Sequence, residues 1–286
     1  MTNTNNVSEI IKFEEFEELN GKRVNSLATL VGDSDEVRVV VHDGMYHADE
    51  LMAIAMINTI THKKKKIKVI RTRDISVVQD GDIVLDVFHT KLDHHDPKKQ
   101  VQEDGRILAA AGLTWRWLKP LFLPVIGEEG WSRIDQSLVL PVDHTDNTGE
   151  MNPFTYSVNA VRGSVGMDGF STCLEMVTLP LQAAVLNELK MFEEQQEYKA
   201  CQQFTVINGK KLRVLDKHLG IFEPADDEAG YIWPENNGYT IKMFTAFGHK
   251  LDKCGVKVGE IPGVLFTHPN GFLGKVNSME DLDKIV

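Results

Sequence analysis

The sequence predicts an α/β protein with a mostly parallel, doubly wound sheet and a smaller C-terminal α+β domain. Short β-branched runs alternate with segments of helical periodicity between residues 37 and 140, the pattern of a sheet built from strand–helix–strand units. From residue 205 the pattern changes to short strands separated by turn signals. The length of 286 residues exceeds the usual size of one domain, so two domains are expected.

The first part of the chain, residues 1–36, is expected to be a polar, acidic leader to which we assign no chemistry. Its weakly amphipathic piece at 10–19 has apolar residues that share one helical stripe, so a short helix is predicted there. The first domain, residues 37–155, follows this leader.

Three strands are predicted in the first domain, at 37–41, 67–71 and 83–88, from runs rich in Val and Ile. A helix that begins after Asp49 separates the first two strands, because its apolar residues recur at helical spacing. Ligands of parallel sheets bind beyond the carboxyl ends of the strands, and His42 and Asp86 occur at such ends.

The remaining elements complete the two-domain prediction. A helical connector at 156–204, interrupted near Pro180, leads to a smaller substrate-binding domain at 205–286, in which hairpin turns are predicted. The elements predicted between the third strand and the connector are a helix at 106–122 that stops near Pro120, a helix at 131–140 and a turn-rich stretch at 141–154.

The composition limits the classes of function. A formal net charge of -11 argues against non-specific coating of nucleic-acid duplexes, which depends on many Lys and Arg contacts to phosphate, although it does not exclude a nuclease. The phosphate-binding loop of nucleotide-dependent ATPases, the dinucleotide fingerprint and the nucleophile elbow of hydrolases are all absent from the sequence.

The expected location is the cytoplasm, with no membrane partner. No apolar stretch approaches the roughly 20 residues that a membrane-spanning helix needs, and the Asn-rich start lacks the features of a signal peptide. The 3 cysteines are odd in number and far apart, so a disulfide framework is not supported.

Histidines and carboxylates follow the first predicted strand. His42, His47 and Asp49 are candidate metal ligands, with Asp49 also a candidate for catalysis. The alternative is structural: Asp49 would be an N-cap with Glu50 in the first helical turn, and the histidines would be surface loop residues.

Asp86 interrupts an apolar run, where an ionised carboxylate without a partner would carry a desolvation cost of several kcal/mol. A metal ion would supply the partner, and hydrogen bonds from backbone amides are the structural alternative. We therefore expect Asp86 to be a metal ligand and a catalytic residue.

Asp93, His94 and His95 form the most specific signal by composition. Adjacent residues of an extended segment point to opposite sides, so one histidine could bind a metal ion while the other faces a substrate phosphate. Asp93 could orient an imidazole from behind the ligands. The alternative is an ordinary polar loop.

Two further acidic residues, Asp143 and Asp146, follow the helix predicted at 131–140. Asp143 comes directly after a buried run and is the better ligand candidate, whereas Asp146, followed by Asn147 and Gly149, is interpreted as a turn residue.

A set of histidines and carboxylates without thiolates suits two divalent ions, with Mn²⁺ preferred and Mg²⁺ as the alternative. Two such ions sharing a carboxylate would activate water for a phosphoester displacement, which requires no covalent nucleophile.

The motifs "HDGMYHADE", "RTRD", "DIVLDV", "LDHHD", "AAAGLTWR", "VDHTDN" and "GVLFTHPNGFLGKV" occur in this order. In this arrangement the chain resembles the MYG1 family of the DHH phosphoesterase superfamily. The resemblance runs from about residue 39 to 146 and returns at 263–276.

The resemblance implies a DHH-type catalytic domain and a metal-dependent phosphodiesterase, similar to 3′ to 5′ exonucleases that act on RNA. It implies that His95 faces the scissile phosphate, and that His268, Gly271 and Phe272 bind substrate, although a plain hairpin explains the last three almost as well. The implied ligands are His42, His47 and Asp86 for one ion, and Asp49, Asp86, His94 and Asp143 for the other.

The prediction is therefore a hydrolase whose partner is RNA or a single-stranded oligonucleotide; a homodimer is the assembly considered. One alternative is a phosphohydrolase of cyclic or short oligonucleotides or pyrophosphate, which substrate-length profiling would distinguish. The other is a non-catalytic interaction protein that keeps the fold, which would bind less than one Mn²⁺ or Mg²⁺ under saturating metal.

Overall fold

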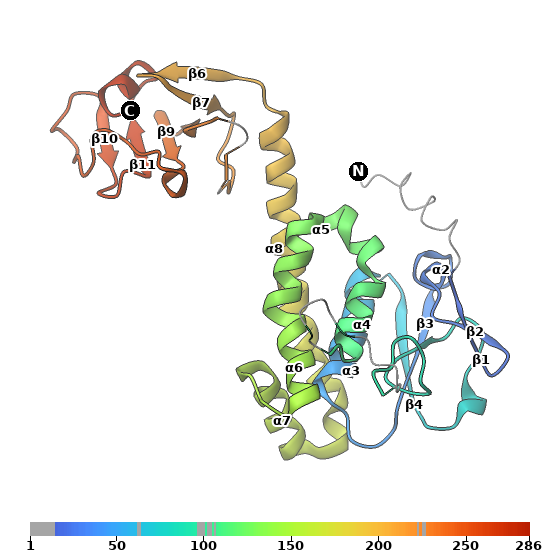
Figure 1. Ribbon diagram of the computed structural model, residues 1–286. Helices are drawn as coiled ribbons and strands as arrows, with labels where there is room; N and C mark the ends of the chain where they lie inside the picture. Colours follow the sequence, from blue (N-terminus) through green and yellow to red (C-terminus); the bar gives the residue numbers. More distant parts are fainter. Residues whose placement is uncertain are drawn as a thin grey trace. The chain divides into compact units, whose positions relative to one another are not determined.

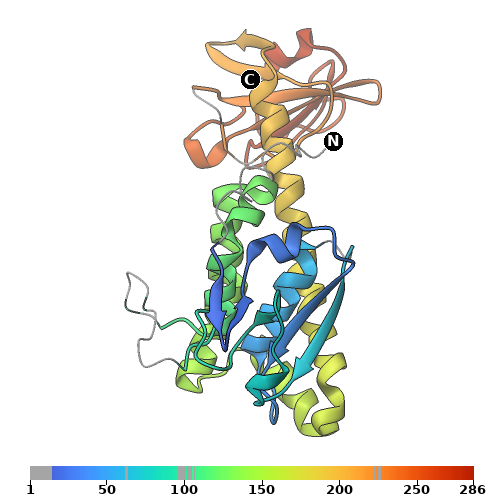
Figure 2. The same ribbon diagram turned by 90° about the vertical axis from the view of Figure 1, so that its right-hand side faces the viewer.

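The computed structural model describes residues 15–61, 64–95, 101, 105, 107–221, 223–224 and 227–286. The chain is a mixed α/β protein that divides into two compact units, one ending at Leu189 and the other beginning at Lys190 (Figures 1 and 2). Each unit has its own hydrophobic core.

A parallel sheet forms the centre of the first unit. It contains β3 (Glu36–Val41), β4 (Lys66–Arg71) and β5 (Ile83–Val84) in the order β4-β3-β5. The register pairs Val41 with Arg71 and Val40 with Val84, so the carboxyl ends of the strands lie at one edge. The class and the parallel pairing predicted from the sequence are thus confirmed.

The two faces of this sheet are covered differently. Val37, Val39 and Val41 point toward the main core, which the helices complete, whereas Val40 packs on the other face with Val24. Figure 1 shows α3, α4 and α6 on one side of β3 and the β1–β2 hairpin on the other. The alternation follows from the two-residue period of a strand.

The N-terminal hairpin corrects one prediction. Glu17–Leu19 form strand β1, which pairs with β2 (Lys22–Val24), where a helix was predicted over 10–19; residues 10–14 lie outside the described part. Asn20 and Gly21 both adopt positive φ, as a tight hairpin turn requires. The short helix α2 (Leu27–Val31) follows.

Helix α3 (Ala48–Ile60) follows β3, as predicted. It is buried on nearly all sides and contacts α4, α6 and α7. Its apolar residues are therefore spread around the helix instead of forming one stripe. Its N-terminal end therefore lies within the protein, next to the carboxyl ends of the strands.

The third strand is shorter than predicted. Pairing in β5 ends at Val84, and Asp86, Phe88 and His89 adopt positive φ values of 53°, 65° and 54°. A left-handed residue cannot continue a strand, which explains why the apolar run at 83–88 does not form one.

The helices after the loop also differ from the prediction. Helix α4 (Ala110–Trp117) ends three residues before Pro120, close to the predicted stop, and Pro120 itself lies in the first turn of the next helix, α5 (Lys119–Ile134), where proline is well tolerated. The stretch predicted to be turns begins with helix α6 (Leu140–Thr148). The other elements here are a short 3-10 helix (Ile75–Val77) and a π-helical turn (Asp135–Val139) between α5 and α6.

Helix α7 (Pro153–Val165) and helix α8 (Phe170–Ala200) follow, joined by a 3-10 turn at Gly166–Gly169. Asn152 caps α7 with a capping box, which fixes the start of this helix. Helix α8 runs through Pro180 as one element, where an interruption was predicted, and it crosses the division between the two units.

The second unit contains a six-stranded sheet in the order β10-β11-β9-β8-β7-β6, in which only the β7–β8 pair is parallel. The predicted turns at 208–209 and 269–271 join β6 to β7 and β10 to β11. The strands are β6 (Phe204–Ile207), β7 (Lys210–Val214), β8 (Gly230–Glu235), β9 (Gly238–Met243), β10 (Val264–Thr267) and β11 (Leu273–Val276), with short 3-10 turns at Thr245–Phe247 and Glu280–Lys284.

Among the described residues, no helix combines the length and the apolar character needed to cross a membrane.

Candidate metal centre

The site lies where the parallel strands end. His42 directly follows β3, and Asp86 comes two residues after β5. The amide of Leu85 still donates to Val40 O at 2.9 Å, so the chain leaves the sheet only at Asp86. This is the edge at which ligands of parallel sheets bind.

The loop after β5 folds back on itself and returns the DHH segment to Asp86. The amide of Asp86 donates to Leu92 O at 3.1 Å, and the amide of Asp93 donates to Thr90 O at 2.9 Å. The left-handed conformations of Asp86, Phe88 and His89 make this reversal possible. Because strain of this kind persists only where surrounding contacts enforce it, and concentrates at functional sites, the loop conformation itself marks the region.

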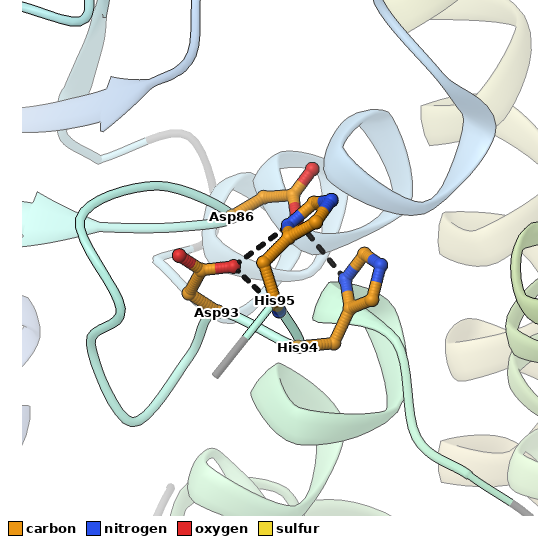
Figure 3. A group of neighbouring side chains, drawn as sticks. All are labelled: Asp86, Asp93, His94 and His95. Atoms are coloured by element: carbon orange, nitrogen blue, oxygen red, sulfur yellow. Dashed lines mark hydrogen bonds and ion pairs between the residues drawn. The ribbon is translucent and has the colours of Figure 1, made fainter. Parts of the chain in front are cut away.

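Three histidines surround the Asp86 carboxylate, whose side chain is fully buried. Its distance is 3.1 Å to His94 Nδ1, 3.3 Å to His95 Nδ1 and 3.4 Å to His42 Nε2. Figure 3 shows His94 and His95 converging on Asp86 from the returning segment. Asp86 is therefore the central residue of the cluster.

Asp93 holds His95 in place. One carboxylate oxygen, Oδ1, lies 2.9 Å from His95 Nδ1 and accepts the His95 amide at 2.9 Å (Figure 3). The other, Oδ2, accepts the amide of His89 at 2.7 Å. These are the contacts expected of a carboxylate that orients an imidazole.

The first turn of α3 contributes two buried carboxylates. Asp49 and Glu50 have fully buried side chains, and Glu50 contacts His42 Nε2. The N-cap position is occupied by His47, so the structural alternative of Asp49 as an N-cap is wrong. Glu50, which sequence reasoning treated only as a first-turn acid, belongs to the cluster.

Helix α6 contributes Asp146, whereas Asp143, the predicted ligand, lies elsewhere. Asp146 Oδ2 is 3.0 Å from His94 Nε2, and Asp146 Oδ1 is 3.9 Å from His47 Nδ1. Asp143 Oδ1 instead accepts the amide of Gly112 at 2.8 Å, near the start of α4. The interpretation of Asp146 as a turn residue is therefore corrected: it lies on a helix and faces the histidines.

The described residues form three groups that could each hold an ion, since one ligand atom per residue lies within 4.8 Å of the others in its group. Asp86 belongs to two of the groups, and Asp143 belongs to none. The groups are Asp86, Asp93, His94 and His95; His42, Glu50 and Asp86; and His47, Asp49 and Asp146.

Buried carboxylate oxygens without hydrogen bonds test whether the residues fit metal ions. Both oxygens of Asp49, Glu50 and Asp86 are buried and make no hydrogen bond, and the same holds for His94 Nδ1. The His94–Asp86 contact is short but lacks hydrogen-bond geometry. Such unsatisfied groups are costly unless a cation binds them. The oxygen and imidazole donors fit divalent metal ions.

The carboxylates of the cluster shift the pKa values of its neighbouring groups upward. Asp86 and Glu50 raise the pKa of His42 to about 11. Burial acts to lower the pKa of His94, but Asp146 and Asp86 raise it to about 10. Burial and the neighbouring Asp86 raise the pKa of Asp49 well above its ordinary value. Without metal, protons thus take the place of part of the missing positive charge.

The remaining predicted residues lie in the second unit. His268 and Phe272 flank the β10–β11 turn with ring centroids 4.3 Å apart, and Gly271 has φ of +71°. The amide of Gly271 donates to His268 O at 2.8 Å, which closes the turn. The geometry shows a hairpin turn with an aromatic pair; its substrate role stays a prediction.

The fold and the cluster define an α/β protein with a candidate site for divalent metal ions. Residues 38–162 match the family model MYG1_exonuc, described as Uncharacterised protein family (UPF0160), so this part of the chain is similar to that family. Comparison with curated proteins and with solved structures gave no significant match. The matched segment includes every residue of the three candidate metal groups.

Proposed function

We propose that the chain is a metal-dependent phosphodiesterase whose first unit is a DHH-type catalytic domain. The observation that carries the proposal is the central position of Asp86, which belongs to two candidate metal groups and is contacted by three histidines. A carboxylate shared between neighbouring divalent ions is the arrangement that two-metal phosphoryl chemistry uses.

The ions would be held by His42, Glu50 and the shared Asp86 on one side, and by Asp86 with His94, His47, Asp49 and Asp146 on the other. When bound, divalent ions polarise the phosphoryl group and lower the pKa of water. Mn²⁺ is proposed, with Mg²⁺ as the alternative, because the donors are oxygen and imidazole.

His95 is the protein group best placed to act on the scissile phosphate. Its side chain is 58% exposed, unlike that of His94, and its Nδ1 is engaged by Asp93 and Asp86. This leaves Nε2 to donate to a phosphate oxygen. Asp86 raises the pKa of His95, which favours the protonated ring and so this contact.

The proposed substrate is RNA or a single-stranded oligonucleotide, cut from its 3′ end. The name of the matched family model, MYG1_exonuc, supports an exonuclease, and phosphate chemistry agrees with the donor set. His268 and Phe272 would supply aromatic surface for a base, with Gly271 between them. A cytoplasmic location is proposed because Cys173, Cys201 and Cys254 are free thiols.

The test uses oligoribonucleotides labelled at either end, with purified protein and Mn²⁺. We expect stepwise shortening from the 3′ end by the wild type and a loss of at least about 10³-fold in rate for Asp86→Asn. Equal rates for the wild type and Asp86→Asn would show that the observed hydrolysis does not come from this site.

A series of substrate lengths, from dinucleotides to 20-mers and including cyclic dinucleotides and pyrophosphate, separates the two enzymatic alternatives. The proposed exonuclease prefers chains that can contact more than the scissile nucleotide. A preference for dinucleotides or pyrophosphate would instead assign the protein to small-molecule phosphohydrolases.

A further inference from the structure

Two arginines from different elements hold the loop that lies between two candidate ligands, His42 and His47. Arg71, the last residue of β4, donates from Nη2 to Gly44 O at 2.6 Å. Arg162 on α7 donates from Nη1 to Tyr46 O at 2.6 Å. Both guanidinium groups therefore lie beside the metal centre, on the loop that connects two of its parts.

Neither arginine is neutralised by an acidic side chain. In the part of the chain that the structure describes, Arg38, Arg116 and Arg133 each pair with a carboxylate, but Arg71 and Arg162 have no such partner. Each guanidinium has five N–H donors and uses one in its contact with the loop. Two positive charges thus stay available for an anion.

The Arg71 side chain is fixed in advance by aromatic contacts. Its guanidinium carbon lies 4.8 Å from the ring centroid of Phe170 and 5.6 Å from that of Tyr46. Its Nε is buried and makes no hydrogen bond. A clamp for the loop needs only the Nη2 contact, so the guanidinium keeps hydrogen-bonding capacity that the described residues do not use.

We propose that Arg71 and Arg162 form a phosphate-binding subsite beside the metal centre, which holds a phosphate group of the nucleotide substrate. This inference rests on the proposed function and adds the residues that would position the substrate. The planar fork of Arg71 can bind two phosphate oxygens at once, which a lysine cannot do. Arg71 and Arg162 are positioning residues and transfer no proton, because a guanidinium stays charged.

The test compares binding of AMP and adenosine, which differ only in the phosphate, to the Mn²⁺-loaded protein by calorimetry. We expect the wild type to bind AMP at least about tenfold more tightly than adenosine, and Arg71→Gln and Arg162→Gln to lose most of this difference. Arg71→Lys keeps the positive charge but lacks the planar guanidinium, so this variant should retain only part of the preference for AMP over adenosine.

Arg73→Gln is the matched control, because it removes one positive charge two residues away. The Arg73 side chain is 66% exposed and already pairs with Asp43 at 3.0 Å. We expect its AMP affinity to stay within about twofold of the wild type, since exposed pairs contribute little. If Arg73→Gln lost as much AMP affinity as Arg71→Gln, the effect would come from the net positive charge of the region, and the proposed subsite would be wrong.

Two further measurements separate the subsite from a structural clamp. Mn²⁺ affinity and the thermal midpoint should be nearly unchanged in Arg71→Gln, whereas KM for an oligoribonucleotide should rise with a smaller change in kcat. A loss of Mn²⁺ affinity as large as the loss of AMP affinity would assign Arg71 to loop support alone.

The subsite and the proposed function can fail independently. If the wild type cuts no oligoribonucleotide, the proposed function is wrong, yet the AMP and adenosine comparison still decides whether the arginines bind phosphate. If the wild type cuts RNA but Arg71→Gln and Arg162→Gln bind AMP normally, only the subsite is wrong.

Discussion

At the scale of single residues, Asp143 and Asp146 provide a direct comparison, because the same helix carries both carboxylates three residues apart. Asp146 lies 3.0 Å from His94, whereas Asp143 accepts a backbone amide from Gly112. We expect Asp146→Asn to weaken Mn²⁺ binding by about 10- to 100-fold, as loss of a ligand or its support does, and Asp143→Asn to change it little. Calorimetric titration with Mn²⁺ measures both. If Asp143→Asn weakened Mn²⁺ binding more than Asp146→Asn, Asp143 would be the ligand, as the sequence predicted.

Asp143 has a different consequence, for stability. Burial raises its pKa to about 7, against the opposing effect of the Gly112 amide. Its folded pKa lies above the unfolded value, so the stability it contributes is complete below about pH 4 and is lost as pH rises toward 7. The loss amounts to a few kcal/mol, on the order of 1.4 per pKa unit. Urea unfolding of metal-free protein should therefore show a smaller decline between pH 4 and 7 in Asp143→Asn than in the wild type. If the free energy of unfolding declined equally with pH in both proteins, Asp143 would not be the cause of the decline.

The predicted site residues at the centre of the cluster are those whose sequence context is unusual. Asp86 stands inside an apolar run, and His94 and His95 are adjacent, so each could be recognised without coordinates. Glu50 and Asp146 were missed because an acid in a first helical turn and an Asp before Asn and Gly are common structural patterns. Had 140–148 been interpreted as a helix, its spacing would have put Asp143 and Asp146 on adjacent turns.

At the scale of elements, the loop after β5 gives a prediction about backbone conformation. His89 has φ of 54°, is largely exposed, and donates its amide to Asp93. Replacement by glycine relieves the left-handed strain, whereas replacement by alanine removes the same imidazole and keeps the strain. We expect His89→Gly to be more stable than His89→Ala by about 1 kcal/mol in urea unfolding. Equal stability of the two variants would show that the conformation carries no cost.

The elements predicted best were β3 and β4, which are runs rich in Val and Ile, and α3, which is a long apolar segment. The third strand was overestimated because local β propensity says nothing about the tertiary contacts that hold Asp86 left-handed. The continuity of α8 through Pro180 was missed because proline alone normally predicts a break. In both places tertiary structure overrides the local preference.

At the scale of the whole molecule, the two units have separate hydrophobic cores, and all candidate ligands lie in the first. Calorimetric unfolding should therefore show two transitions. Mn²⁺ should raise the midpoint temperature of only one of them, the transition of the first unit, because a ligand stabilises the unit that binds it. Arg213 and Glu228, a buried pair in the second unit, allow the other to be assigned. Arg213→Met should lower that transition, since breaking a buried pair costs about 3 to 5 kcal/mol, and should leave Mn²⁺ affinity unchanged. A single transition shifted by both changes would contradict this independence.

The π-helical turn at Asp135–Val139 has a consequence for how Asp146 reaches the histidines. A wider turn of this kind accommodates one additional residue, and each residue of an α-helix turns the chain by about 100° about its axis. Removing one residue, such as Ser137, would rewind this stretch as regular helix and swing the later side chains around the axis. Asp146 would then face away from His94. The extra residue of the π-helical turn therefore determines the direction in which Asp146 points.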